Sequence, residues 1–447
     1  MGLKYIEMIK TVALIFLIGL SLVLTFLIWN SAPYDTIGRK ETVDISITED
    51  AEKKDIASVV KPYKIHFNFA EGITGTTDSE QMNDMVNHLK RWRLSNPVLG
   101  DKSFNENALN QFLKRENQAV FYFSDEVPLP VYESVLNIEN PNVPETSFDL
   151  IVVEWNLSDA MIDVHFINRE NELRYQSTTK MYEQQAFIRD IITAGRSYDE
   201  YVEANPDGGK FIVVPANEVQ LIQNTYFPNE KDEINPTRFR SALFSDPNAV
   251  RRNEVSATRE EFQDNHALMT VDTEKKILQF VHPIVESREL AIPSELLEDA
   301  IDFLNEHGGW TDEYRFSNMN FKTRYVNFKL YVRGIPVLGG NTLTEIEQVW
   351  GDESVYQYKR PYYTLGETLP SETEIITLPS GTEIADALMA SKEIDFNEIE
   401  EILPAYYMQQ DVALNIFVLE PSWYYKLNGK WHRFMTGQVG GDMNGLE

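Results

Sequence analysis

An uncharged and mostly aliphatic stretch near the N-terminus most constrains what this chain can form. No charged residue occurs between Lys10 and Asp35, and the run TVALIFLIGLSLVLTFLIWN fills residues 11–30. A helix of about 20 apolar residues is long enough to span the hydrocarbon core of a bilayer. We therefore expect a single transmembrane helix, with nearly all of the chain on one side of the membrane.

The residues that flank the run favour a cytoplasmic N-terminus. Basic residues close to a span orient it most strongly, and Lys4 and Lys10 precede this one. Trp29 suits the outer interface, where aromatic rings meet lipid headgroups. We predict a cytoplasmic tail at residues 1–10, a transmembrane helix at residues 11–30, and extracytoplasmic domains after it, anchored to the cell membrane.

The same run is longer than the apolar part of a cleaved signal peptide, which has about 7–15 residues before an A-x-A-like site. The nearest small pair is Ser31-Ala32, and Pro33 follows it at a position that suits cleavage poorly. A lipoprotein anchor needs a cysteine, and the chain has none. An uncleaved anchor is therefore the preferred interpretation, and a cleaved signal is the alternative.

Composition limits the partners and the chemistry. The chain has 447 residues, of which 43% are hydrophobic, so it can build two to four domains of about 100–200 residues. Its formal net charge of −30 makes nucleic acid an unsuitable partner, because phosphate binding needs clustered Lys and Arg. The absence of cysteine excludes disulfides and thiol chemistry, and in an extracytoplasmic chain of this size it fits a bacterial protein.

Motifs of common enzyme classes are missing from the sequence. There is no G-x-S-x-G or H-E-x-x-H motif and no phosphate-binding glycine loop. No two of the seven histidines lie three to five residues apart, and His165 is expected to be a structural residue on a strand. Ser58 and Lys61 match S-x-x-K, but Pro62 would end the helix that this chemistry needs. We predict no enzymatic activity, no cofactor and no metal site.

Acidic and aromatic residues are too frequent to identify a site by themselves. Glu398, Glu400 and Glu401 are expected on the solvated side of a helix at residues 378–403, with Phe396 and Ile399 facing inward. The tyrosines and tryptophans mostly alternate along expected strands, where they would serve as core or cross-strand pairs. An aromatic groove that binds glycan remains an alternative use for them.

Alternation of apolar residues and turn signals predicts the order of the elements. Ser380 and Glu383 have the spacing of a capping box, and Arg333-Gly334 and Asn428-Gly429 are expected turns. The expected strands and extended segments are 61–70, 119–124, 128–135, 147–155, 163–168, 211–215, 325–337, 345–365, 415–427 and 430–434, and a hairpin is expected at 268–283. The expected helices are 82–92, 105–115, 180–193, 236–244, 293–310 and 378–403.

This order indicates an α+β fold, in which helices pack on the faces of antiparallel sheets. The NPDGG sequence at residues 205–209 is the clearest break in the middle of the chain. We predict three extracytoplasmic α+β domains after the transmembrane helix, at residues 31–207, 208–312 and 313–447.

The expected transmembrane helix is the preferred functional surface. Lipid does not drive apolar helices together, so their association relies on small and weakly polar residues. Gly19, Ser21 and Thr25 are such residues, and Ser21 and Thr25 lie on one face because they are four positions apart. The alternative is that these hydroxyls only bond carbonyls of their own helix.

Several segments of the chain resemble the YycH family of extracytoplasmic regulatory proteins. They run from the membrane anchor to the C-terminal hairpin, and none of them is a catalytic motif. The segments are IKTVALIFLIGLSLVLTFLIWNSAPYD (9–35), FRSALFSDPNAVRRN (239–253), FKLYVRGIPVLG (328–339) and FVLEPSWYYKLNGKWHRF (417–434).

The resemblance implies a regulator of the two-component system that controls cell-wall metabolism in Firmicutes. It implies one N-terminal helix, a three-domain ectodomain whose last two domains are similar to those of a YycI-like membrane protein, and association with that protein and with a sensor histidine kinase of the YycG/WalK type. It implies no catalytic residue. The role of Gly19, Ser21 and Thr25 as contacts is our own inference from packing.

We therefore expect a non-enzymatic, membrane-anchored regulator that modulates a sensor histidine kinase through transmembrane helix contacts. Its partners would be the kinase, a YycI-like protein and membrane lipid. The alternatives are an envelope enzyme whose site is assembled from residues distant in sequence, and a glycan-binding module. A pocket with convergent carboxylates would favour the enzyme, and a continuous exposed aromatic groove would favour the module.

Overall fold

The computed structural model divides the chain into two units, Met1–Ile45 and Ser46–Glu447. The structure describes residues 52–100, 104–139, 143–158, 161–180, 184–206, 208–228, 234–368 and 373–435, together with positions 14, 17, 19, 21 and 47.

Few positions of the first unit are described. Residues 14, 17, 19 and 21 are helical, and the side chains of Leu14 and Leu17 are exposed. The rest of the expected span at residues 11–30 lies outside the described residues, as do the tail at residues 1–10 and Thr25. The described residues include no helix that combines the length and the apolar character of a bilayer-crossing segment.

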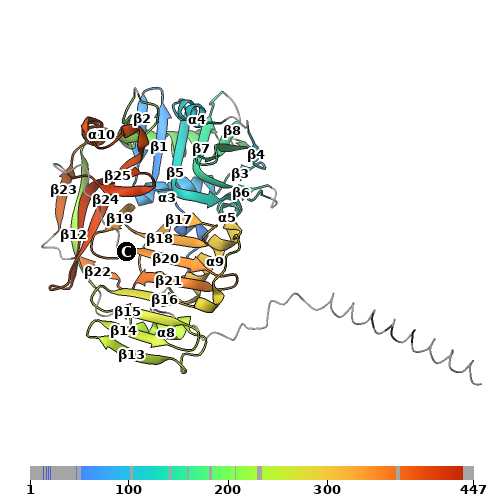
Figure 1. Cartoon of the computed structure of the whole chain (residues 1–447). Helices are drawn as coiled ribbons and strands as arrows, with labels where there is room; N and C mark the ends of the chain where they lie inside the picture. The colour runs from blue at the N-terminus through green and yellow to red at the C-terminus, as the bar shows by residue number, and fades with distance from the viewer. Residues whose placement is uncertain are drawn as a thin grey trace, which may run out of the picture. The chain divides into compact units, whose positions relative to one another are not determined.

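The second unit has a mixed α+β fold in which most strand pairs are antiparallel. Helices and helical turns connect and cover its sheets (Figure 1). They are α2 (Ile56–Val59), α3 (Ser79–Leu89), α4 (Glu106–Leu113), α5 (Leu129–Glu133), α6 (Gln184–Phe187), η1 (Ile188–Thr193), α7 (Ala194–Arg196), α8 (Pro236–Leu243), η2 (Pro283–Val285), α9 (Pro293–Glu306), α10 (Gly381–Ala390) and η4 (Phe396–Glu398).

A nine-stranded sheet forms from the first half of this unit. Its order is β11-β10-β2-β1-β5-β7-β8-β9-β4, and every neighbouring pair is antiparallel. The strands are β1 (Lys64–Phe69), β2 (Gly72–Thr76), β4 (Val98–Leu99), β5 (Gln118–Pro128), β7 (Ser147–Trp155), β8 (Met161–Asn168), β9 (Leu173–Lys180), β10 (Asp199–Glu203) and β11 (Val213–Pro215).

Both faces of this sheet are covered, which explains why its central strands are almost entirely apolar. On β5, Phe121 belongs to the same core cluster as Met82 of α3, whereas Val120 belongs to a second cluster with Phe112 of α4. The strand β7 is buried at seven of its nine positions. The sequence prediction of a central strand at residues 147–155, paired with the strand that follows it, is confirmed.

A 15-stranded sheet forms from the remainder of the chain. Its main path runs β13-β14-β15-β16-β21-β20-β18-β19-β24-β25-β12-β22, with β17, β23 and β26 paired at its sides. The strands are β12 (Val219–Pro228), β13 (Arg251–Ser256), β14 (Arg259–Gln263), β15 (Leu268–Asp272), β16 (Ile277–Val281), β17 (Tyr314–Asn320), β18 (Tyr325–Val332), β19 (Ile335–Gly339), β20 (Glu345–Trp350), β21 (Val355–Pro361), β22 (Leu365–Thr368), β23 (Glu374–Leu378), β24 (Ile399–Asp411), β25 (Ile416–Leu427) and β26 (Lys430–Arg433). A separate parallel pair joins β3 (Arg93–Leu94) to β6 (Asn137–Ile138).

Several local predictions for this half are confirmed. The helix expected at residues 293–310 forms as α9 (Pro293–Glu306), and α10 begins with the capping box of Ser380 and Glu383. The φ angles are 53° and 82° at Arg333 and Gly334 and 50° and 75° at Asn428 and Gly429, so both expected turns use left-handed backbone. The buried residues of α9 are Ser294, Leu296, Leu297, Ala300, Ile301 and Leu304.

Two predictions are wrong. Residues 129–133 form the helix α5 rather than an extended segment, because Pro130 lies in the first helical turn, where no backbone N–H is needed. The helix expected at residues 378–403 ends at Ala390, and Ile399 begins the long strand β24. Pairing of β24 with β25 along its whole length outweighs the helical spacing of its apolar residues.

The strand expected at residues 211–215 is present as β11, and it pairs with β10 in the nine-stranded sheet. The first sheet therefore includes residues on both sides of the break at residues 205–209. The division into domains at residues 31–207, 208–312 and 313–447 stays a prediction.

The segment that enters the second unit is attached to the C-terminal half of the fold. Ile47 is 1% exposed, and its N–H donates to the His307 carbonyl at 2.9 Å. The Lys54 N–H donates to Asn305 Oδ1 at 2.8 Å, and Lys54 Nζ donates to the Asp312 carbonyl at 2.8 Å. The chain therefore packs against α9 and the start of β17 before it enters the first sheet.

Candidate functional site

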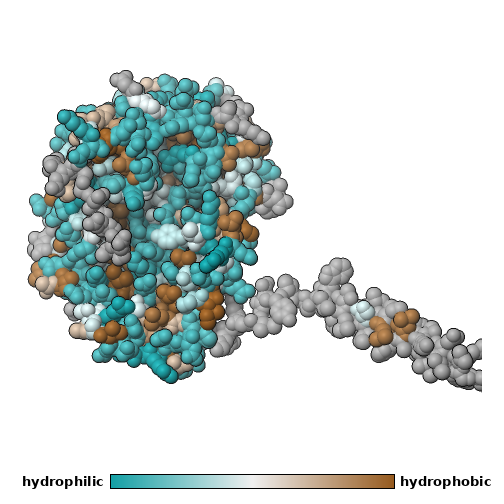
Figure 2. Space-filling model, viewed as in Figure 1, coloured by the Kyte–Doolittle hydropathy of each residue, from teal (hydrophilic) through white to brown (hydrophobic). Residues whose placement is uncertain are grey.

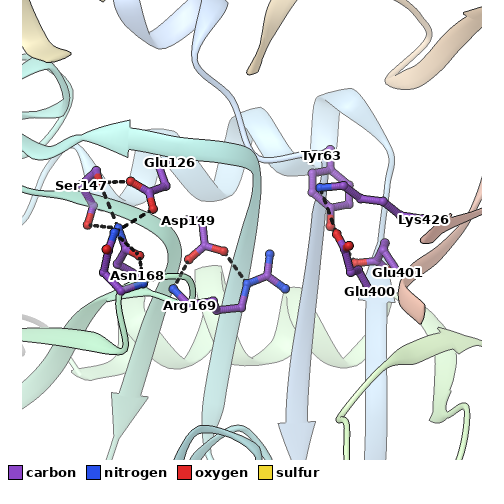
Figure 3. Close-up of polar contacts among 10 residues, drawn as sticks. Tyr63, Glu126, Ser147, Asp149, Asn168, Arg169, Glu400, Glu401 and Lys426 are labelled. Carbon is purple, nitrogen blue, oxygen red and sulfur yellow. Dashed lines mark hydrogen bonds and ion pairs between the residues drawn. The ribbon is translucent and has the colours of Figure 1, made fainter. Parts of the chain in front are cut away.

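A cleft of about 960 Å³ lies between the nine-stranded sheet and the 15-stranded sheet. This volume is at the upper end of the range of about 300–1,000 Å³ that is typical of ligand sites. Both sheets contribute polar side chains to its lining, and Figure 3 shows most of those discussed below. Tyr63, Tyr122 and Asp149 come from the first sheet and its entry, and Lys329, Glu401 and Lys426 come from the second.

Glu401 of β24 joins the two sheets at one side of the cleft. Tyr63 Oη donates to Glu401 Oε2 at 2.7 Å, and Lys64 Nζ lies 2.7 Å from Glu401 Oε1 (Figure 3 shows the tyrosine contact). Lys64 is 2% exposed and Glu401 is 5% exposed. Burial lowers the pKa of Lys64, although Glu401 opposes that shift. Burial and the Glu401 charge raise the pKa of Tyr63 well above its usual value, so the phenol stays a hydrogen-bond donor.

This arrangement corrects the interpretation of the Glu398, Glu400 and Glu401 cluster as a solvated helix face. Glu398 ends the turn η4, whereas Glu400 and Glu401 lie on β24 and line the cleft. A carboxylate can be this buried because Lys64 balances its charge and two further groups donate to it. One of these donors is Tyr63, and the other is the Ile402 N–H, at 3.1 Å from Glu401 Oε1.

Arg169 and Asp149 form another part of the cleft lining. The Arg169 N–H donates to Asp149 Oδ1 at 3.0 Å, and Arg169 Nε donates to Asp149 Oδ2 (Figure 3). The Arg169 side chain is 37% exposed, and its two Nη nitrogens have no acceptor among the described residues. Asp149 therefore orients the guanidinium and leaves its outer edge available to a ligand.

Two neighbouring carboxylates of β5 continue the polar surface. Asp125 Oδ2 accepts from the Met319 N–H at 2.9 Å, which is a second link between the sheets. Burial raises the pKa of Asp125 to about 6, although backbone hydrogen bonds oppose the shift. Glu126 Oε2 accepts from Ser147 Oγ at 2.5 Å (Figure 3), and Glu126 Oε1 accepts from Asn171 Nδ2 at 3.0 Å.

The hairpin of β25 and β26 lines the cleft on the same side as Glu401, where Figure 3 shows Lys426 beside Glu400. Glu400 Oε1 accepts from the Gly429 N–H at 2.7 Å, and Glu400 Oε2 lies 3.4 Å from Lys426 Nζ. Gly429 has a φ of 75°, which a glycine adopts without strain and which the tight turn requires. The turn predicted from Asn428-Gly429 therefore positions one wall of the cleft.

Other residues that the sequence singled out lie elsewhere. Ser58 belongs to the first turn of α2, which ends at Val59, and its Oγ donates to the Asp55 carbonyl at 2.7 Å. His165 is buried on β8, with its ring edge-on to Phe112 at a centroid distance of 5.0 Å. The described residues include no group of three His, Cys, Asp or Glu side chains arranged to hold a metal. Gly19 and Ser21 are helical, and Thr25 is outside the description.

Sequence reasoning missed the cleft because its residues are far apart along the chain. Lys64 and Glu401 are 337 positions apart, and no local pattern connects them. No local signal identifies the pair, since Lys64 begins the alternating run KIHFNF and only the structure shows that all six residues of this strand are buried. A lysine within such a strand requires an acidic partner.

Family comparisons cover most of the chain. The family model described as "YycH protein, N-terminal domain" matches residues 7–193, and "YycH protein, C-terminal domain" matches residues 210–437. The chain is 23% identical to the two-component system WalR/WalK regulatory protein YycH of Bacillus subtilis strain 168, over 95% of each chain. The fold is similar to that of the crystal structure of YycH from Bacillus subtilis, with a TM-score of 0.70 and 20% identity over 87% of this chain and 98% of that one.

Proposed function

We propose, from the premise that this chain belongs to the YycH family, that it is a non-enzymatic, membrane-anchored regulator of a WalK-like sensor histidine kinase. The observation that carries the proposal is the end-to-end match to a relative named as a regulatory protein of the WalR/WalK system. The regulator would act with a YycI-like partner, through contacts between transmembrane helices.

The hydrogen bonds of the segment around Ile47 and Lys54 support the proposal that conformational changes pass between the ectodomain and the anchor. The backbone N–H groups of Ile47 and Lys54 donate to the end of α9, and the Lys54 side chain donates to the Asp312 carbonyl just before β17. A change in the ectodomain would therefore shift the chain that leads to the helix expected at residues 11–30. A kinase with two signalling states responds to any contact that prefers one of them, and a coupling of about 1–3 kcal/mol changes an equilibrium about 5- to 150-fold.

Copurification tests the contact through the membrane. The full chain is expressed with the kinase and a YycI-like protein, next to a version in which an unrelated apolar helix replaces residues 11–30. We expect the kinase to copurify with the native chain and to be lost with the replaced anchor. Equal recovery of kinase with both versions would remove the helix from the mechanism.

Single substitutions refine that test. Gly19→Leu, Ser21→Leu and Thr25→Leu add bulk at the small and weakly polar positions, so they should reduce kinase recovery. Leu20→Ile is the matched control, since it keeps an apolar residue of equal size, and it should leave recovery unchanged. Loss with the control and no loss with the three variants would refute the proposed contact face.

The envelope enzyme is a second candidate, because carboxylates converge in the cleft and the pKa of Asp125 is raised to about 6. A carboxyl group with a raised pKa in a cleft is a candidate general acid. Purified full-length chain is incubated with peptidoglycan, and soluble fragments are measured. We expect no release above that of an Asp125→Asn variant, and release by the native chain alone would favour the enzyme.

A further inference from the structure

We propose that the cleft between the two sheets binds an extended basic peptide, whose lysine or arginine side chains pair with carboxylates of the lining. Carboxylates outnumber basic side chains eight to four among the lining residues. Three of the four bases already have acidic partners: Arg169 pairs with Asp149, Lys426 with Glu400, and Lys329 with Glu345.

Five lining carboxylates have no ion-pair partner among the described residues. Asp125 and Glu126 accept only hydrogen bonds from neutral groups. Glu170 and Glu172 are exposed in the turn between β8 and β9. The fifth is Glu106 of α4. Among the described residues, Lys210 is the single lining base without an acidic partner. This imbalance attracts a ligand that carries several positive charges.

An unpartnered donor is a second and independent sign of a ligand. Tyr122 lines the cleft and is 3% exposed, but its Oη has no hydrogen-bond partner within the described parts of the chain. A buried hydroxyl without a partner costs about 1–3 kcal/mol, so an acceptor from a ligand would satisfy it. Burial raises the pKa of Tyr122 well above its usual value, so the phenol stays protonated and can donate.

A peptide supplies both of the chemistries that the lining requires. Its backbone carbonyls are acceptors for Tyr122 Oη and for the free edge of Arg169, and its basic side chains suit the unpaired carboxylates. A polyamine offers cations without carbonyl acceptors, and a neutral glycan offers hydroxyls without cations. The lining also includes Phe104, Leu109, Phe211, Leu403 and Trp431, which provide apolar contact for the aliphatic stems of the peptide.

Fluorescence anisotropy with defined probes tests the proposal. The full-length chain, in nanodiscs of zwitterionic lipid, is titrated into a labelled, end-capped octapeptide of alternating lysine and alanine. Competition then uses the same peptide with glutamate for lysine, spermine, and chitotetraose. We expect the lysine peptide to bind, to weaken with added salt, and to be displaced poorly by the other three probes. No saturable binding of the lysine peptide, or preferred binding of chitotetraose or spermine, would overturn the proposal.

Two variants localise the binding and have matched controls. Tyr122→Phe removes only the unpartnered hydroxyl, so affinity should fall about five- to tenfold while thermal stability stays level or rises. The control is Tyr424→Phe, because Tyr424 is buried with an unpartnered Oη but does not line the cleft. This control should bind normally. Equal affinity of both variants and the native chain would show that the cleft is not the site.

A double variant tests the carboxylates. Glu170→Gln with Glu172→Gln should weaken peptide binding about fivefold, since it removes two exposed charges of the lining. Glu374→Gln with Glu393→Gln changes the net charge equally at exposed positions outside the lining, and it should leave binding unchanged. An equal loss with both pairs would mean attraction by net charge alone and would overturn the proposal. The titration contains no kinase, so its outcome is separate from that of the copurification.

Discussion

At the scale of single residues, the central contact is the buried pair of Lys64 and Glu401, with Nζ and Oε1 2.7 Å apart. Glu401→Gln leaves the lysine charge buried without its counter-ion, so we expect the chain to lose about 3 kcal/mol of stability. Glu400→Gln is the matched control, because Glu400 is 34% exposed and its pair with Lys426 is worth under about 1 kcal/mol. Thermal unfolding of the full chain measures both, and equal losses would contradict the assigned burial.

Asp312 gives the fold a pH dependence of known sign. Burial raises the pKa of Asp312 to about 7, against opposing effects of the Leu365 N–H and Arg360, while an unfolded aspartate has a pKa of about 3.9. Between these values the folded state keeps a proton that the unfolded state has lost, so stability falls as pH rises. Asp312→Asn should therefore stabilise the chain by about 2 kcal/mol more at pH 8 than at pH 5. Unfolding at the two pH values measures this gain, and a gain that is equal at both would refute the shifted pKa.

At the scale of elements, the capping box of α10 should have a measurable effect. The Glu383 N–H donates to Ser380 Oγ at 3.3 Å, and the Ser380 N–H donates to Glu383 Oε2 at 2.9 Å. Ser380→Ala should cost about 1 kcal/mol, whereas Ser380→Asp keeps an acceptor and should cost much less. Hydrogen exchange of the α10 amides reports the loss. No difference in exchange between the two variants would mean that packing of α10 against β11 and β24 alone fixes the helix.

Local sequence signals correctly predict the elements that are determined by interactions between residues close in the sequence. The capping box at Ser380 and the turn at Asn428-Gly429 both form as predicted, because neighbouring backbone groups determine them. Residues 399–403 have helical spacing but become the strand β24, because the partner strand β25 lies further along the chain. The extended segment expected at residues 128–135 is instead partly helical, because the first turn of α5 tolerates Pro130.

At the scale of the whole molecule, the mixed α+β architecture follows from the order of strands and helices, but the cleft does not. Its lining requires the two sheets to face each other, and that juxtaposition depends on contacts such as Asp125 to the Met319 N–H. Figure 2 shows a mostly hydrophilic face with small separate hydrophobic patches, which fits the net charge of −30. Membership in the YycH family, already expected from the resemblance of the segments, is confirmed.

The central claim is that this chain regulates a sensor kinase through its anchor, and kinase autophosphorylation in vesicles tests it most directly. The WalK-like kinase and the YycI-like partner are reconstituted alone, with the full chain, and with the chain whose residues 11–30 are replaced by an unrelated apolar helix. We predict that the native chain changes the phosphorylation rate at least about fivefold and that the replaced anchor abolishes the change. The same rate in all three samples would contradict the account.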